Sequence, residues 1–321
     1  VDLGKTDGDP RFYSYARAAI APWWDAESPP PAILRLRAKL QEREHLYEKA
    51  LADLEQLLEQ VPDDAQALLE CANINRVLGR YEAARAACQK LSSVAGIVPQ
   101  TLCSAPIQAV TGRAEDAYEA FAQILPLARE QLPSTVPWIT TLQAEISTAL
   151  GRDETAERHF REGLKLQPGD QYLLRAYADF LLDRSRADEA LELLREHTRD
   201  TGILLRAAIA ARRAGDAELA ATWTRQLEMR FEEIRLRGGE PHGRFEARHA
   251  LELKDDPETA LELALANWNK QKETRDTRNV LEAAVAARNP AAAAPVLAFL
   301  AEHNNEHLIL RNLATQLEAM R

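Results

Sequence analysis

A short pattern recurs along this chain: a glycine, an alanine five residues later and, in most copies, a bulky residue four residues beyond the alanine. The clearest copies are Gly79 with Ala84, Gly112 with Ala117, Gly151 with Ala156, and Gly215 with Ala220. Self-similarity at a fixed period indicates a stack of small structural units. Such a stack gives another chain a long surface to bind and seldom encloses a pocket for chemistry.

The same register continues between and beyond these glycines. Ala50 lies 34 residues before Ala84, and Ser185 lies 34 residues after Gly151. A second alanine precedes the turn by seven residues in successive units, at Ala72, Ala105, Ala144, Ala178 and Ala208. This arrangement resembles the tetratricopeptide repeat (TPR), a helix–turn–helix unit of about 34 residues. The resemblance covers residues 31–230 closely and residues 241–301 more loosely, through Ala260 and Ala294.

The residue types favour helices throughout. Helices cross closely only where small side chains lie at the contact, because the distance between their axes follows the residues there. Apolar residues recur at spacings of three and four, as at Leu51, Leu54 and Leu58, and no segment alternates with a period of two. The resemblance implies an all-α fold, a right-handed α-solenoid of antiparallel helix pairs with about seven to eight repeats. We expect residues 308–321 to form an amphipathic helix that caps the array.

Three glycines and a proline interrupt the helical pattern at residues 237–243, which predicts a bend or a boundary there. We therefore divide the chain into residues 1–240, a TPR array with a truncated first repeat, and residues 241–321. The second part holds looser repeats and the capping helix, continuous with the array. Val1 to Gly4 resemble the end of a helix with no helix before them, so we expect a missing segment upstream of Val1.

The charge balance restricts the partners. The 321 residues carry a formal net charge of −10, whereas a protein that neutralises phosphates needs a basic face. Pentatricopeptide repeats, which read RNA, have a similar period, but this acidic chain shows no basic stripe. We expect no nucleic-acid partner. No apolar run approaches the roughly 20 residues that cross a bilayer, so we also expect a protein that is not integral to a membrane.

Three cysteines bear on the compartment. Cys71, Cys88 and Cys103 could be three small buried thiols, since free cysteine is among the most buried residue types. Alternatively, Cys88 and Cys103 could form a disulfide, which would imply an oxidising compartment. The segments at residues 9–13 and 21–24 resemble those of bacterial repeat proteins that are often exported. That resemblance favours the periplasm over the cytoplasm.

Catalytic motifs are missing from the sequence. There is no His-Glu-x-x-His, glycine-rich phosphate loop, Cys-x-x-Cys or nucleophile elbow. His303 and His307 have a spacing compatible with a metal, but they flank Asn304-Asn305, which is typical of a surface turn. His242 and His249 lie two helical turns apart, about 10 Å, too far to share one ion. We expect that the protein is not an enzyme and that it has no cofactor and no metal site.

The candidate site comes from the TPR resemblance. In that family the partner usually lies along the inner face, which the first helix of each unit lines. The corresponding residues are Arg35, Lys39, Asn73, Arg76, Trp138, Tyr172, Arg175, Asp179, Arg206 and Arg212. The first four resemble part of the carboxylate clamp with which some TPR proteins hold a C-terminus. The match is partial, because a lysine stands where the clamp prefers asparagine.

The sequence therefore predicts a non-catalytic scaffold or adaptor that binds a protein or peptide along its inner face. Two alternatives stay open. The chain could be the interaction arm or regulatory domain of a larger protein, or it could carry a metal or a small ligand through its histidines. The identity of the partner and the oligomeric state are not predicted.

Overall fold

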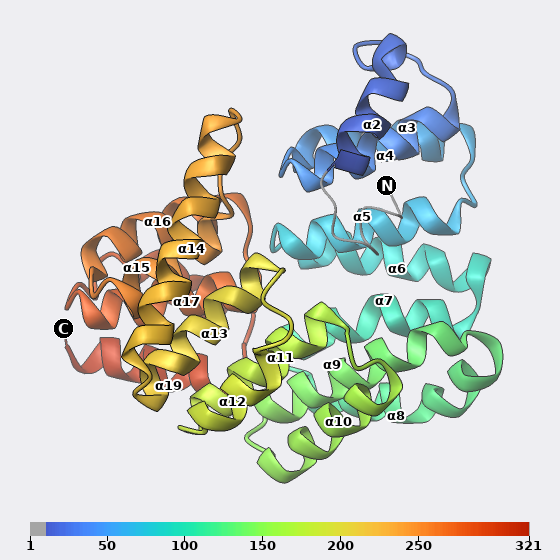
Figure 1. The fold of residues 1–321 in the computed structure, drawn as a ribbon. Helices are drawn as coiled ribbons and strands as arrows, with labels where there is room; N and C mark the ends of the chain where they lie inside the picture. Colours follow the sequence, from blue (N-terminus) through green and yellow to red (C-terminus); the bar gives the residue numbers. More distant parts are fainter. Residues whose placement is uncertain (1–10, 321) are drawn as a thin grey trace. The chain divides into compact units, whose positions relative to one another are not determined.

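The computed structural model describes residues 11–320, in which helices and turns account for all regular structure and no strand is present (Figure 1). The truncated first repeat expected at Val1 to Gly4 lies outside these residues. Helices follow one another as antiparallel pairs, and the all-α solenoid predicted from the repeats is confirmed. The chain divides into two compact units, residues 1–107 and 108–321.

The first unit begins with a short helix and a 3₁₀ turn, followed by helix pairs. Its elements are α2 (Arg11–Ala19), η1 (Ala21–Trp23), α3 (Pro31–Arg43), α4 (Tyr47–Gln60), α5 (Ala65–Val77), α6 (Tyr81–Ala95) and most of α7 (Ile97–Val110). Helices α3 and α4 pack as one pair, and α5 and α6 as the next.

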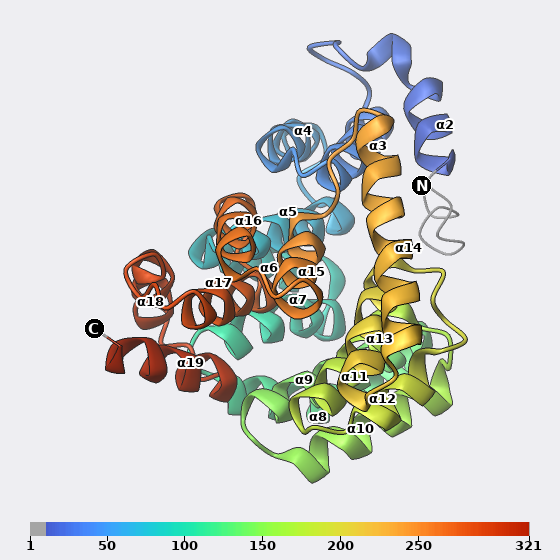
Figure 2. The same ribbon diagram turned by 60° about the vertical axis from the view of Figure 1, so that its left-hand side comes forward.

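The second unit continues the same pairing. Its elements are α8 (Ala114–Gln131), η2 (Pro133–Thr135), α9 (Val136–Ala149), α10 (Asp153–Leu166), α11 (Gln171–Asp183), α12 (Ala187–Leu194), α13 (Thr201–Ala214), α14 (Ala217–Leu236), α15 (Gly243–Leu253), α16 (Pro257–Lys270), α17 (Thr274–Ala286), α18 (Ala294–Glu302) and α19 (Leu308–Ala319). The last helix packs on α17, as a cap should, and it also contacts α9 (Figure 2).

The turn inside each pair explains the recurring glycine. Gly79, Gly112, Gly151 and Gly215 all have φ between 73° and 86°, the left-handed region that glycine enters without steric cost. Other residues adopt the same conformation where the glycine is missing, including Ser185 with φ 58° and Asn304 with φ 50°. The turn is therefore more regular in the structure than in the sequence.

Small residues lie where the helices cross. Ala84, Ala117 and Ala156 are fully buried, as are the first-helix alanines Ala144 and Ala178. The bulky positions fill the seam beside them, with Phe121 and Phe160 among the largest buried side chains. In the second unit two large apolar clusters span residues 144–231 and residues 247–317, and a smaller one surrounds Leu174.

A disulfide joins the last helices of the first unit. Cys88 on α6 and Cys103 on α7 are bonded, with their Cα atoms 5.5 Å apart, and Cys71 is a buried free thiol. Of the two interpretations that the sequence left open, the structure has the bonded one. The oxidising compartment that such a bond would imply stays a prediction.

The segment between α14 and α15 is the interruption seen in the sequence. Gly238 there has φ 77° and has open space around it. In the sequence this segment lies between the buried cluster of residues 144–231 and that of residues 247–317, whereas the compact units divide at Ile107. The domain boundary at residue 240 stays a prediction.

Candidate partner-binding surface

The residues that we selected lie on the first helix of successive pairs. Arg35 and Lys39 are on α3, Asn73 and Arg76 on α5, Trp138 on α9, Tyr172, Arg175 and Asp179 on α11, and Arg206 and Arg212 on α13. We call α3, α5, α7, α9, α11, α13, α15, α17 and α19 the A helices. The structure shows that most of these polar side chains bind side chains of other A helices or of the turns beside them, whereas Arg76 binds Asn73 on its own helix.

In the first unit, cationic side chains of α3 form ion pairs with carboxylates on α5 and at its N-terminus. Arg35 forms an ion pair with Asp64, whose carboxylate also accepts the Ala67 amide at 2.9 Å and so caps α5. The Lys39 ammonium lies 3.5 Å from the Glu70 carboxylate. Arg35 and Lys39 therefore each already bind a carboxylate of the chain itself.

The amide part of this cluster is engaged in the same way. The Asn73 side chain donates to Glu42 at 3.1 Å and accepts from Arg76 at 3.0 Å. These bonds bring Asn73 and Arg76 together, while Arg35 and Lys39 bind their own carboxylates. The Arg35 side chain remains 35% exposed and that of Lys39 21%, so water and a partner can reach both.

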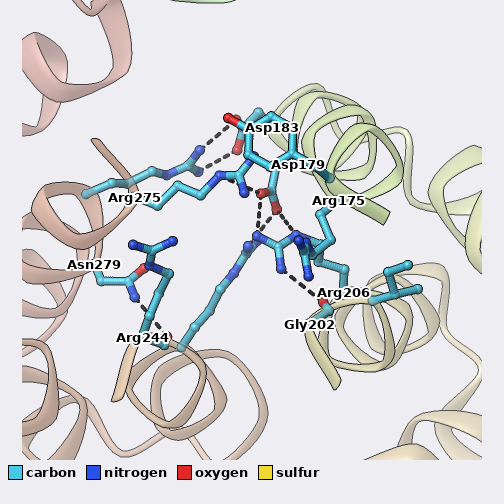
Figure 3. Close-up of polar contacts among 12 residues, drawn as sticks. Arg175, Asp179, Asp183, Gly202, Arg206, Arg244, Arg275 and Asn279 are labelled. Atoms are coloured by element: carbon cyan, nitrogen blue, oxygen red, sulfur yellow. Dashed lines mark hydrogen bonds and ion pairs between the residues drawn. The ribbon is translucent and has the colours of Figure 1, made fainter. Parts of the chain in front are cut away.

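Asp179 is the centre of a larger network in the second unit (Figure 3). Its two carboxylate oxygens accept hydrogen bonds from Arg206 at 2.9 and 2.6 Å. Arg248 on α15 donates to the same carboxylate at 2.5 Å. Arg275 on α17 approaches to 3.9 Å. Four A helices therefore meet at one aspartate.

The neighbouring polar residues follow the same rule. The Tyr172 hydroxyl donates to Glu145 at 2.7 Å, and Arg275 binds the other Glu145 oxygen at 3.1 Å. Arg175 binds Asp200, which caps α13, at 3.1 Å. Arg212 binds Asp255 at 2.7 Å. The uncharged side chain of Trp138 is 40% exposed.

Burial sets the electrostatics of this network. Burial alone would raise the pKa of Asp179, but Arg206, Arg248 and Arg275 outweigh it and hold that pKa far below its ordinary value. Burial raises the pKa of Glu145 against the opposing effect of Arg275. It also lowers the pKa of Arg206 despite Asp179. Asp179 is therefore a permanent anion at the meeting point of arginines.

The sequence did not identify half of this network. Arg248, Arg275 and Arg278 come from the looser repeats after residue 240, where the register of the A helices is hard to follow. Arg244 belongs to the same group and binds Asp276 at 2.6 Å. A signal existed in the spacing of four between Arg244 and Arg248 and of three between Arg275 and Arg278, since both pairs share a helix face.

The histidines do not assemble a metal site in the part of the chain that the structure describes. No group of three metal-binding side chains is placed to hold an ion there. His307 precedes α19, and burial lowers its pKa to about 4, with Arg278 contributing. No helix in residues 11–320 is both long and apolar enough to span a membrane.

The chain was compared with family models, curated proteins and solved structures. No family model matches the sequence, and no curated protein matches it. Among solved structures, the chain is similar to PilW, described as a type IV pilus biogenesis factor, at 19% identity and a TM-score of 0.50 over 63% of this chain and 94% of PilW. A chain of the APC/C Cut9–Hcn1 hetero-tetramer matches at 12% identity and a TM-score of 0.51 over 95% of this chain and 52% of its own length.

A third similar structure is a tetratricopeptide repeat protein from Parabacteroides merdae, at 16% identity and a TM-score of 0.48 over 68% of this chain and 84% of that one. Identities this low bear on architecture and not on activity. The first two likenesses, together with the repeat period, the paired helices and the buried alanines, lead to one conclusion. The chain has the fold of the tetratricopeptide-repeat proteins.

Proposed function

We propose that this protein is a non-catalytic scaffold that binds a carboxylate-bearing protein or peptide segment on the A helices of its first unit. The fold supports a general role in protein interaction, because a solenoid presents an extended surface of repeated elements. The partner itself and the groups that it presents are the finer part of the proposal.

One observation carries the choice of surface. Arg35 and Lys39 each hold a carboxylate, from Asp64 and Glu70, and yet both remain partly exposed. A guanidinium and an ammonium in this state are already placed for carboxylate binding. An acidic segment or a C-terminus could bind the exposed side of these two groups while Asp64 and Glu70, whose side chains are only 13% and 10% exposed, stay in place.

The second unit is a weaker candidate for the same role. Its inner-face residues Tyr172, Asp179 and Arg206 are bonded to other A helices of the unit, and Arg206 is only 2% exposed. A partner would have to displace several charge-assisted bonds at once. We therefore place the binding surface on α3 and α5.

Site-specific photo-crosslinking tests this placement. A photoreactive amino acid replaces Asn73 on α5 or, as the matched control, Gln89 on α6, and both positions are exposed. The proposal expects a crosslinked protein or peptide from position 73 and none from position 89. Crosslinks of equal strength from both positions, or from position 89 alone, would remove the A-helix face from consideration.

Charge reversal tests the chemistry of the same surface. Arg35→Glu with Arg76→Glu should abolish capture of the crosslinked partner, while Arg85→Glu with Lys90→Glu on α6 should keep it. Circular dichroism checks that both variants remain helical. A partner that both variants retain does not bind through carboxylates on α3 and α5.

A further inference from the structure

The second unit breaks the usual rule of a solenoid, in which each repeat contacts only its neighbours. Arg275 on α17 reaches Glu145 on α9, at 3.1 Å. Arg278 on the same helix binds Asp183 at the end of α11, at 2.8 Å. Arg248 on α15 binds Asp179 on α11. The late repeats therefore contact the early ones directly across the inner face (Figure 3).

The turn before α19 makes a second set of such contacts, with the turns around α8 and α9. The Glu306 carboxylate accepts the Ala114 amide at the start of α8, at 3.0 Å. The Asn305 side chain donates to the Val110 carbonyl at 3.1 Å. Leu308 lies so close to Gly151 that a Cβ added to that glycine would be 2.9 Å from its side chain. We call these and the three arginine contacts the closing contacts.

The closing contacts differ in kind from the contacts that build the array. Neighbouring repeats are joined by apolar side chains, as where Phe245 and Leu253 on α15 pack against the cluster of residues 144–231. The closing contacts are ion pairs and hydrogen bonds, apart from Leu308, and they add to the apolar packing that α15 makes with both clusters. Breaking them would leave both clusters covered.

Water also reaches two of the three closing arginines, whereas the side chain of Arg248 is only 11% exposed. The side chains of Arg275 and Arg278 are 22% and 21% exposed. A charge pair in this situation contributes little net stability, because both ions recover hydration when they separate. Units of a protein that are joined by polar contacts tend to open independently of the rest.

We propose that the closing contacts form a releasable latch, and that the second unit opens along them to expose an inner face that is partly covered in the closed form. The exposed face would carry the carboxylates of Glu145 and Asp183, which lose Arg275 and Arg278 on opening and so favour a basic segment of a partner. This inference concerns the second unit alone. It can fail while the carboxylate-binding surface of the first unit stands, and the reverse is also true.

A distance measurement in the full chain tests the latch. Spin labels are attached to cysteines that replace Glu119 on α8 and Asn312 on α19, both exposed, in a chain that carries Cys71→Ser and keeps the native disulfide. Pulsed electron paramagnetic resonance then gives the distribution of distances between the labels. The closed form gives one short distance, and opening adds a longer one.

Arg275→Gln with Arg278→Gln should move most of the population to the longer distance. Arg186→Gln is the matched control, because Arg186 binds Glu157 at 2.8 Å and Glu189 at 2.6 Å but joins only neighbouring elements. It should keep the distribution of the parent chain. A double variant that stays helical and keeps the short distance would overturn the latch.

Salt provides the second route and needs no substitution. Raising the ionic strength to about 1 M shortens the screening length to ~3 Å and should increase the longer-distance population of the parent chain. This arm decides the matter if the double variant does not fold. An unchanged distribution between low and high salt would show that the second unit is a rigid closed body.

Discussion

The two units use the same repeat and similar side chains with different results. In the first unit, arginine, lysine and asparagine on α3 and α5 bind acidic groups of the adjacent repeat, and Cys88–Cys103 adds a covalent link. In the second unit, arginines on α15 and α17 cross to α9 and α11. The difference teaches that an inner-face position is open to a partner only where the array does not contact itself.

This contrast has a physical origin in how contacts add along a solenoid. Apolar contacts between neighbours set the rotation from one repeat to the next, and the rotations accumulate. After several repeats in the second unit, α19 meets α9. Charged side chains that would otherwise face solvent then find opposite charges in their own chain.

The largest expected effect comes from removing a core ring of the second unit. Phe160 is almost fully buried and stacks on Tyr177 with the ring centroids 5.0 Å apart. Phe160→Ala should lower the free energy of unfolding of the second unit by about 3–5 kcal/mol, because it removes apolar contact and leaves a cavity. Hydrogen exchange resolved by peptides checks this. Equal acceleration in residues 31–95 would mean that the two units unfold together and would weaken the comparison.

The next effect belongs to the first unit. The Cys88–Cys103 bond closes a loop with a sequence separation of 15, and a crosslink of this length restricts the unfolded chain. Cys88→Ala with Cys103→Ala should destabilise the first unit by about 3 kcal/mol. Denaturant unfolding with and without a reducing agent provides the measurement. The variant should not respond to the reductant, and a parent chain that does not respond either would contradict a stabilising disulfide.

Alanine substitutions at two turn glycines distinguish the cost of backbone strain from the loss of the closing contacts. A Cβ on Gly112 would lie 2.9 Å from the Asn304 side chain, whereas one on Gly215 would have open space. Both glycines have positive φ, 74° and 86°, so alanine at either position should cost about 1–2 kcal/mol of backbone strain. Gly112→Ala should also increase exchange in α19, and Gly215→Ala should not. Identical exchange in α19 would show that Asn304 gives way without disturbing the closing contacts.

The smallest effect is a pH dependence confined to the second unit. Burial, with Arg278 next, lowers the pKa of His307 from 6.5 to about 4. Between these values the unfolded chain binds a proton that the folded chain resists, so stability should fall as the pH drops through this window. The raised pKa of Glu145 acts in the opposite sense and reduces the net change. His307→Gln should flatten the dependence, measured by urea unfolding at several pH values, and an unchanged slope would exclude His307 as its source.

Much of the fold could be read from particular residues. The left-handed turns were visible at four glycines, and the buried helix crossings at Ala84, Ala144 and Ala156 followed from their fixed distance to those turns. These features are local, because a turn or a close crossing restricts residue type at one position. Turns at Ser185 and Asn304 were harder to read, since those residues enter the left-handed region at some steric cost and leave a weak signal.

The candidate site was predictable only in part. The repeat resemblance placed Tyr172, Asp179 and Arg206 on the first helices of their units, and the structure has them on α11 and α13. It did not show that Arg248 and Arg275 would bind there, because the separation between Asp179 and Arg248 is 69 residues and no local pattern records such a pair. The choice between a free and a bonded Cys88 likewise depended on whether α6 and α7 bring the two sulfurs together.

The sequence by itself determined the repeat, the helix pairs, the positions of small residues and the acidic balance of the chain, because each depends on residue type and spacing. Only the tertiary structure decided which inner-face charges remain open to a partner. That outcome depends on the summed rotation of many repeats, and a small rotation at each one determines whether distant helices meet. Two units with the same repeat pattern can therefore present different surfaces to a partner.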